Sequence, residues 1–408
     1  MKKYLIKVLK RLFVIWLIWS LALTGYEMIR LKIPMKLCLY EEDAVTVLSG
    51  DHKNLKPEEL YLDFAGNVQI TEKSDGTYMA SCHLFGWIPL KTMEIQVVSR
   101  EEVIPGGIPV GIYIQTDGVF VIGTGNIETT HGLIESPAKN IIKTGDYITG
   151  FQGEPVRNKQ ELVKKLNHCR EQQITLEIRR NEETMELSIN PIILQDGAHM
   201  GIWIRDDTQG IGTLTYVTED QEFGALGHGI SDTDSELLME VSEGKLYSCE
   251  IMKIVKGQKG LPGKLSGKII YSKEHLYGTV NANSSGGIYG KGNEHLMENV
   301  SGKQIPIALK HEVKEGSATI ISSVSGRPEE YTVEIRKVYR NGEDVNKGME
   351  LVVTDERLLE ITGGIVQGMS GSPIIQNGKL IGAVTHVLVN DPTRGYGIFI
   401  ENMLDAAG

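Results

Sequence analysis

The chain has 408 residues, a formal net charge of −11, and 41% hydrophobic and 23% charged residues. This length exceeds what one hydrophobic core normally serves, so at least two domains are expected. The composition is that of a globular protein, and the acidic balance argues against nucleic acid as a partner. Its 46 glycines and 13 prolines predict many turns and short strands, and therefore a mainly β protein.

The N-terminus combines basic residues with an apolar run. Lysines and an arginine lie between Lys2 and Arg11, and the apolar run Leu12–Leu23 follows them. Positive charge before such a run keeps that end in the cytoplasm, so the rest of the chain would lie outside the cytoplasmic membrane. The run is short for a spanning helix, and a cleaved secretory signal competes with an uncleaved anchor. We favour an uncleaved membrane anchor, formed by residues 1–34.

Residues 35–102 contain alternating apolar and polar segments, such as Leu60–Phe64 and Met93–Val98, and no catalytic constellation. They predict a β-rich spacer. The four cysteines have no metal-ligand spacing and are spread over different modules, so neither a disulfide scaffold nor a metal site is expected, and no cofactor is implied: Cys38, Cys82, Cys169 and Cys249.

Residues 103–193 have a PDZ-like pattern. A helix is predicted from Asn158 to Asn167, and a hairpin of two strands over Ile174–Ile189 closes the module. A PDZ domain accepts an extended peptide as an additional strand and captures its terminal carboxylate with main-chain N–H groups. We predict that this carboxylate-binding loop and its strand are formed by Val110, Gly111, Ile112 and Tyr113. A domain that only packs on the rest of the chain is the alternative.

Residues 194–408 consist of short apolar strands separated by turns rich in Gly, Asn, Ser and Lys, which predicts a sandwich or barrel. Within them, Gly368-Met-Ser-Gly-Ser-Pro373 places a serine in a glycine-flanked turn. Such a turn can expose Ser370 as a nucleophile while the N–H groups of Gly368 and Ser370 form an oxyanion hole. Ser372 would then be a bystander. The strand, Asn-Gly turn and strand that follow predict a hairpin that supports the loop.

A serine hydroxyl needs a base, and the chain has ten histidines. His228 lies between glycines in a small-residue turn that follows the strand-like Gly212–Val217, and it is the preferred base. His386 has the appearance of a strand residue beside the site and is the second choice.

The segments Gly224–Ile230 and Thr362–Pro373, continued by Thr385-His386 and Asn390-Asp-Pro392, resemble the stage IV sporulation protein B peptidases, membrane-associated serine peptidases of endospore-forming bacteria. The resemblance implies a chymotrypsin-like double β-barrel with Ser370 as nucleophile, His228 as base and Asp355 as acid. Asp355 lies unusually close to the serine in sequence. Asp232 and Asp234, which follow His228, are local competitors.

The resemblance also implies a role. The catalytic part would act between the two forespore membranes, cleave itself, and cleave a partner in the membrane-embedded complex of a second protease that processes a pro-sigma factor. A non-catalytic PDZ adaptor with a degenerate protease fold and a general quality-control protease are the alternatives.

Overall fold

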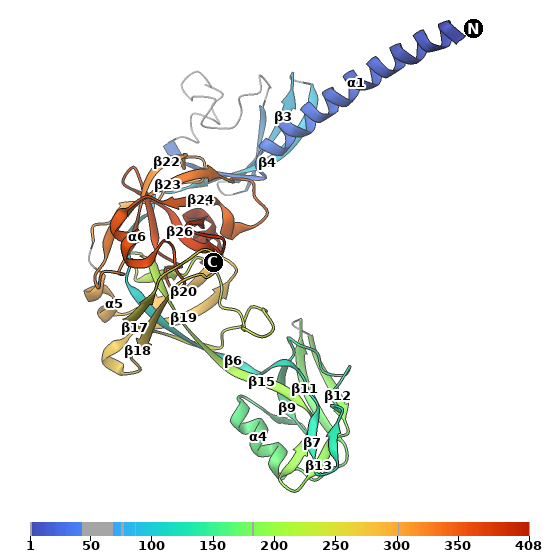
Figure 1. Cartoon of the computed structure of the whole chain (residues 1–408), viewed down its shortest axis with the longest axis vertical. Coiled ribbons are helices and arrows are strands. Elements are labelled where there is room, and N and C mark those ends of the chain that lie inside the picture. The colour runs from blue at the N-terminus through green and yellow to red at the C-terminus, as the bar shows by residue number, and fades with distance from the viewer. Residues whose placement is uncertain are drawn as a thin grey trace.

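The computed structural model describes residues 2–42, 68–74, 77–85, 87–181, 183–300 and 302–407 (Figure 1). Helix α1 (Lys2–Lys32) projects away from the rest of the molecule. Its segment Tyr4–Lys32 is long and apolar enough to cross a membrane, and it is not buried in the protein. A signal sequence near an N-terminus has the same properties, so the helix alone is weak evidence for an anchor.

The predicted spacer contains a small sheet with the strand order β1-β4-β3-β2, formed by β1 (Lys36–Tyr40), β4 (Ile88–Val98), β3 (Thr77–Leu84) and β2 (Val68–Ser74). Strand β4 includes the predicted strand Met93–Val98, whereas Leu60–Phe64 lies outside the described residues. The apolar face of the sheet packs against the end of α1, where Tyr26, Ile29 and Ile33 contact its core.

The PDZ module has its own core, built around helix α4 (Lys159–His168) and the paired strands β11 (Ile174–Arg180) and β12 (Glu183–Ile189). The side chain of Asn158 caps α4 by accepting a hydrogen bond from the N–H of Glu161, so the predicted helix is confirmed to within one residue. The remaining short strands are β7 (Ile127–Thr129), β8 (Gly132–Ile134), β9 (Tyr147–Phe151), β10 (Glu154–Pro155), β13 (Ile192–Leu194) and β14 (Gly197–His199).

The first barrel is a closed circuit of strands in the order β6-β17-β19-β20-β16-β15, in which β15 pairs back onto β6. Its strands are β6 (Pro109–Thr124), β15 (Ile202–Val217), β16 (Glu222–Ala225), β17 (Glu243–Val255), β19 (Leu276–Ser284) and β20 (Gly287–Gly292). Around it lie β5 (Glu102–Pro105), β18 (Lys264–Ile269), η1 (Lys273–His275), α5 (Glu294–Asn299) and β21 (Ile305–Pro306).

The second barrel is closed in the order β22-β23-β24-β27-β26-β25. Its strands are β22 (Gly316–Ser322), β23 (Glu329–Val338), β24 (Met349–Val353), β25 (Pro373–Gln376), β26 (Lys379–Leu388) and β27 (Asp391–Phe399), with η2 (Val345–Lys347), α6 (Glu356–Thr362) and α7 (Ile400–Ala407). The Asn377-Gly378 turn joins β25 to β26, and both residues have positive φ, as the predicted hairpin requires. A mainly β, double-barrel fold is confirmed.

The PDZ module is inserted into the first barrel rather than placed before it. The two longest strands, β6 and β15, pair with each other in the barrel and again in the module (Figure 1). Along β6, Val110, Ile112 and Ile114 belong to the barrel core, whereas Val119 and Val121 belong to the module core. The predicted boundaries at residues 103 and 194 stay a prediction. Neither strand respects the division into two domains, because β6 begins in the barrel within the predicted PDZ range and β15 begins in the module within the predicted peptidase range.

This insertion also overturns the predicted carboxylate-binding loop. Val110, Gly111, Ile112 and Tyr113 pair with β15 on one side and with β17 on the other, inside the first barrel. Both edges of this segment are occupied, so it has no edge at which a peptide could add. The prediction came from a local Val-Gly-Ile-Tyr pattern, which a buried barrel strand satisfies equally well.

Candidate functional site

The turn that carries Ser370 lies between α6 and β25 of the second barrel, but strand β15 of the first barrel holds it. The N–H of Thr213 donates to the carbonyl of Ser370 at 2.9 Å, and the Thr213 hydroxyl donates to the carbonyl of Gly368 at 2.9 Å. A Cβ added at Gly371 would lie 2.0 Å from the Thr213 carbonyl oxygen, so only glycine permits this approach. The two barrels therefore fix the turn jointly.

Ser370 and Ser372 have different environments. The Ser370 side chain is partly buried at a pocket, and its Oγ donates to the carbonyl oxygen of Thr385 in β26 at 2.7 Å. Ser372 is fully buried, and its Oγ has no hydrogen-bond partner among the described residues. Only Ser370 is placed where a substrate carbonyl could approach its hydroxyl.

The backbone N–H groups around Ser370 fall into two sets. Those of Gln367, Met369, Gly371 and Ser372 donate to carbonyl oxygens of the protein at 2.8–3.1 Å. Those of Gly368 and Ser370 have no hydrogen-bond partner among the described residues. Two free donors on either side of Met369 are what an oxyanion hole requires, and they are the two that the sequence predicts.

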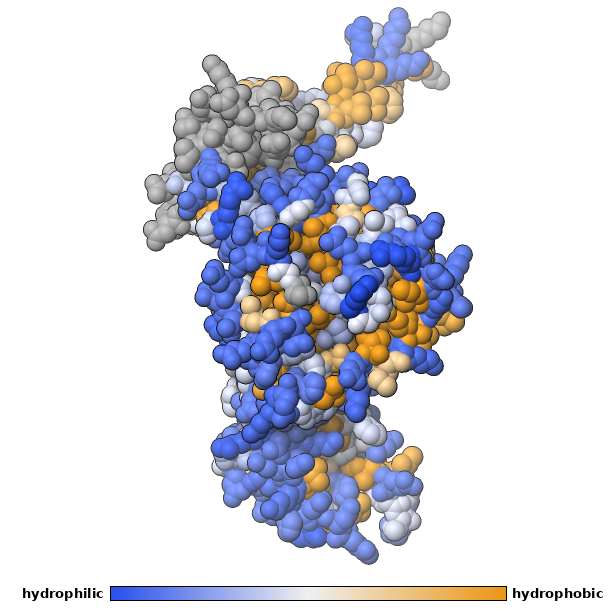
Figure 2. Space-filling model, turned by 90° about the vertical axis from the view of Figure 1, so that its left-hand side faces the viewer, coloured by the Kyte–Doolittle hydropathy of each residue, from blue (hydrophilic) through white to orange (hydrophobic). Residues whose placement is uncertain are grey.

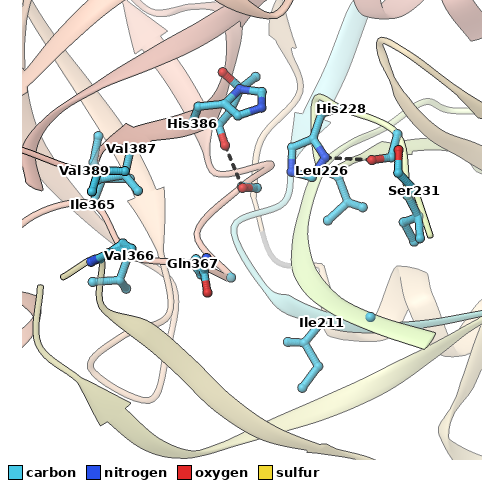
Figure 3. A pocket seen from close by; sticks show the side chains of 17 residues that line it. Ile211, Leu226, His228, Ser231, Ile365, Val366, Gln367, His386, Val387 and Val389 are labelled. Atoms are coloured by element: carbon cyan, nitrogen blue, oxygen red, sulfur yellow. Dashed lines mark hydrogen bonds between the residues drawn. The ribbon is translucent and has the colours of Figure 1, made fainter. Parts of the chain in front are cut away.

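His228 follows β16 in a turn where Leu226 and Gly227 both have positive φ. Its Nδ1 lies 2.9 Å from the carbonyl oxygen of Gly229 (Figure 3). That contact assigns the proton to Nδ1, because a carbonyl can only accept, and it leaves the Nε2 lone pair available as a base. Burial lowers the pKa of His228 below its usual value, which favours the neutral imidazole.

His386 lies beside His228, with ring centroids 5.4 Å apart and planes inclined by 38°. Partial desolvation and the neighbouring His228 lower the pKa of His386, and Asp344 opposes this effect. His386 therefore contacts the predicted base from the second barrel, as the prediction of a strand residue beside the site requires.

A pocket of about 470 Å³ brings Ser370, His228 and His386 together (Figure 3). Its walls come from both barrels, and the described residues that line it include no Asp, Glu, Lys or Arg. The apolar part of the lining is Ile211, Leu226, Ile230, Pro262, Ile365, Val366, Val387 and Val389. A second hollow, of about 510 Å³, shares Gly210, Ile211, Gln367 and Gly368 with it. The two hollows therefore adjoin at these four residues, and Ser370 lines the first of them.

The structure does not bring Asp355 to His228. Asp355 is the N-cap of α6 and accepts hydrogen bonds from the N–H groups of Arg357 and Leu358. Its carboxylate also pairs with the Arg357 guanidinium at 2.9 Å, which lowers the pKa of that carboxyl. The assignment of the triad acid to Asp355 stays a prediction that rests on the resemblance.

The carboxylates of Asp232 and Asp234, the two alternative acids, also bond groups other than His228. Asp232 is buried and pairs with Arg205, and it accepts hydrogen bonds from Asp234 and Ser235 in the turn after His228. Asp234 is a second partner of Arg205. In this structure the backbone carbonyl of Gly229 occupies the place at Nδ1 that a triad carboxylate normally takes.

Sequence reasoning missed Asn346, which lies in η2 of the second barrel. Its Nδ2 donates to the carbonyls of Gly227 and Ser285 in the first barrel at 2.6 and 2.7 Å, and its own carbonyl accepts from the Thr385 hydroxyl at 2.7 Å. No local motif marks such a residue, because its partners are far away in sequence.

Among the described residues, no group of His, Cys, Asp and Glu side chains could hold a metal ion.

Comparison with solved structures gives partial similarities. The PDZ domain of an SdrC-like protein from Listeria monocytogenes is 18% identical, with a TM-score of 0.18, over 22% of this chain and 90% of that one. The Rv3671c protease from M. tuberculosis in its active form is 14% identical, with a TM-score of 0.28, over 49% of this chain and 75% of that one. The HtrA-type protease AlgW with a decapeptide is 10% identical, with a TM-score of 0.28, over 50% of this chain and 53% of that one. No curated protein matches the chain significantly.

Two family models match the chain and show which family it belongs to. A PDZ domain model matches residues 121–190, which begin after the wrongly predicted Val110–Tyr113 and cover most of the module inserted between β6 and β15. The model of the SpoIVB peptidase S55 family matches residues 196–404, half of the chain, including both barrels' loops at the pocket. The chain belongs to the SpoIVB peptidase S55 family and is a serine endopeptidase that carries a PDZ domain.

Proposed function

We propose that Ser370 is the nucleophile and His228 the general base of this endopeptidase, with the oxyanion hole formed by the N–H groups of Gly368 and Ser370. Ser370 Oγ attacks the scissile carbonyl while His228 Nε2 takes its proton, and the carbonyl oxygen gains negative charge between the two N–H groups. His228 then gives the proton to the leaving amine. Water hydrolyses the acyl-enzyme by the same steps in reverse.

The hydrogen bond from Ser370 to Thr385 defines a resting state. While Oγ donates to the Thr385 carbonyl, its proton is not directed at His228. Strand β26 ends at the pocket, so an extended substrate can pair with it and present a backbone N–H to the Thr385 carbonyl. That competition would release the Ser370 hydroxyl to turn toward His228, and the catalytic contact would form with substrate.

The pocket indicates which side chains the enzyme accepts next to the scissile bond. Its walls are apolar and lack charged side chains, so burying an apolar substrate side chain there is favourable. A charged side chain would lose its hydration without finding a partner. We therefore propose cleavage beside uncharged, apolar residues.

The PDZ module offers one unpaired strand edge beside its helix. Among the described residues, the first part of β15, Ile202–Arg205, pairs with β6 on one side only, and α4 packs nearby, where the N–H of Lys159 donates to the Asp206 carboxylate at 2.7 Å. We propose that a peptide ligand adds at this edge. The same strand continues to Gly210, Ile211 and Thr213 at the active site, so the ligand would bind the strand that holds the Ser370 turn.

The biological role is proposed from family membership. With α1 as anchor, the catalytic part would act outside the cytoplasmic membrane, in the space between the two forespore membranes. It would cleave itself and a partner in the membrane-embedded complex of a second protease, and so trigger pro-sigma factor processing during sporulation.

The observation that carries the proposal is that Ser370, His228 and two free N–H donors meet at one pocket. It is tested by comparing Ser370→Ala with Ser372→Ala in the full chain. Ser370→Ala should abolish both self-processing and fluorophosphonate labelling, and Ser372→Ala should retain them. If Ser372 were the labelled residue instead, the nucleophile and the oxyanion assignment would both be wrong.

A further inference from the structure

We propose that the β3–β4 turn, through Phe85 and Trp87, inserts into the outer interface of the bilayer that α1 crosses. The inference rests on the proposed membrane anchor and adds a second, protein-side contact to it. Its occupant is the lipid interface itself rather than a partner protein.

Phe85 and Trp87 expose large aromatic side chains at a turn whose backbone geometry does not require aromatic residues. Phe85 is 69% and Trp87 is 74% exposed, whereas the large apolar side chains described in β1, β3 and β4 are buried or partly buried. Phe85 also has a φ of 54°, a region that turns normally fill with Gly or Asn. The turn geometry therefore does not explain why an aromatic residue stands at its tip.

The position of the turn follows from two hydrogen bonds between α1 and β4. Lys91 Nζ donates to the Ile33 carbonyl at 2.8 Å, and the Tyr26 hydroxyl donates to the Pro89 carbonyl at 2.7 Å. Moving from Lys91 to Pro89 along β4 thus corresponds to moving from Ile33 back to Tyr26 along α1. Trp87 and Phe85 are the next residues in that direction, so they lie level with the part of α1 that precedes Tyr26.

That level is where α1 changes from apolar to charged. The segment from Leu12 to Tyr26 contains no charged residue, whereas Glu27, Arg30 and Lys32 follow it. Figure 2 shows the hydrophobic band of α1 between its hydrophilic end and the body of the protein. Tryptophan is enriched at this boundary of a bilayer because its ring is apolar and its N–H can reach water. A lipid interface therefore matches both the chemistry and the height of the turn.

The chain has four tryptophans, which allows a direct test: Trp16, Trp19, Trp87 and Trp203. Three full-length proteins, each keeping only Trp19, Trp87 or Trp203 and carrying Phe at the other positions, are reconstituted in nanodiscs with or without brominated phosphatidylcholine. Fluorophosphonate labelling checks that each variant is folded. Trp203 is the matched control, since it is 66% exposed in the PDZ module.

We expect bromolipid to quench Trp19 and Trp87 and to leave Trp203 unchanged. Quenching of Trp19 without quenching of Trp87 would overturn the inference and leave the anchor intact. If Trp19 also stayed unquenched, α1 would not lie in the bilayer, and the anchor and the inference would both fail. Equal quenching of Trp87 and Trp203 would show non-specific lipid contact and would likewise overturn the proposal.

Discussion

Asn346 Nδ2 lies 2.6 Å from the carbonyl oxygen of Gly227, the residue directly before the proposed base. The same side chain bonds Ser285, and its backbone carbonyl accepts from Thr385, whose own carbonyl accepts from Ser370. One residue, through its side-chain amide and its backbone carbonyl, therefore connects the His228 turn of the first barrel to the strand that holds the nucleophile in the second. Since base and nucleophile come from different barrels, their separation depends on such contacts.

Asn346→Ala should lower kcat on the order of a hundredfold, because a small displacement of reacting groups has an effect of this size. KM should change less, since Asn346 does not line the substrate pocket. Asn402→Ala is the matched control, because Asn402 Nδ2 donates to Val345 in the same segment, at 3.3 Å, without contacting the His228 turn. Cleavage kinetics of both variants decide the matter. Equal, small effects would contradict a positioning role.

His228→Ala should reduce turnover nearly to the level of Ser370→Ala, because losing the base leaves the hydroxyl inactive and the members of a catalytic unit are not additive. His386→Ala should cost less, since His386 contacts the base only through its ring. Both variants are compared in one cleavage assay. If His228→Ala kept normal turnover while His386→Ala were inactive, the base would be His386 of the second barrel.

The pH dependence follows from the lowered pKa of His228. A general base must be neutral, and a pKa below the ordinary value of about 6.5 keeps the imidazole neutral at lower pH. The acid limb of kcat/KM should therefore have an apparent pKa below about 6.5, and activity should persist in mildly acidic solution. A limb above that value would show that substrate or another group stabilises the imidazolium. Because His386 is adjacent, the two rings titrate as a pair.

Thr213→Val should impair the oxyanion hole. The substitution removes the hydroxyl that holds the Gly368 carbonyl and leaves the N–H bond to Ser370 in place. The freed carbonyl belongs to the Gly368–Met369 peptide, which lies between the two peptides that carry the donor N–H groups, so losing its anchor should misalign those donors. Loss of one oxyanion donor typically lowers kcat by roughly a hundredfold or more. Thr215→Val, which removes a similar bond to Gly371 at 2.8 Å, is the control for stability alone. Identical kinetics for the two variants would argue against the proposed hole.

Asp355→Asn discriminates two roles. As the triad acid, Asp355 would be needed to orient His228, and the change would cost on the order of ten-thousandfold in rate, as the same substitution of the triad aspartate does in chymotrypsin-type proteases. As the cap of α6, it would be replaced by a good capping residue with little effect on rate. The contacts in this structure favour the second result. Rates and unfolding midpoints are measured beside Asp232→Asn and Asp234→Asn, and a severe rate loss confined to Asp355→Asn would establish the acid.

Local chemistry explains what could be predicted. The Ser370 turn, the Asn377-Gly378 hairpin and the α4 helix each depend on residues within a few positions, so the sequence predicts them well. The PDZ boundary could not be read in this way. The barrel half and the module half of β6 are equally apolar, and only their partners on β15 and β17 tell them apart.

The same distinction applies to the site. Ser370 and His228 stand in glycine-rich turns that a motif can mark. Asn346, Thr213 and the Gly229 carbonyl act through contacts between segments distant in sequence or through the backbone, and such contacts leave no side-chain pattern. Asp355 shows the converse, since the carboxylate that the resemblance assigns as the triad acid is used for helix capping in this structure.

The insertion of the PDZ module into the first barrel imposes an order on folding. When β6 leaves the ribosome, β15 has not been made, because the whole module lies between them. The barrel must therefore wait for a domain that can form its own core early, and contacts across such a separation are slow to form. A chain whose PDZ module misfolds would not bring β15 to β6 to close the barrel that carries His228, so active protease is expected only after the module has been made.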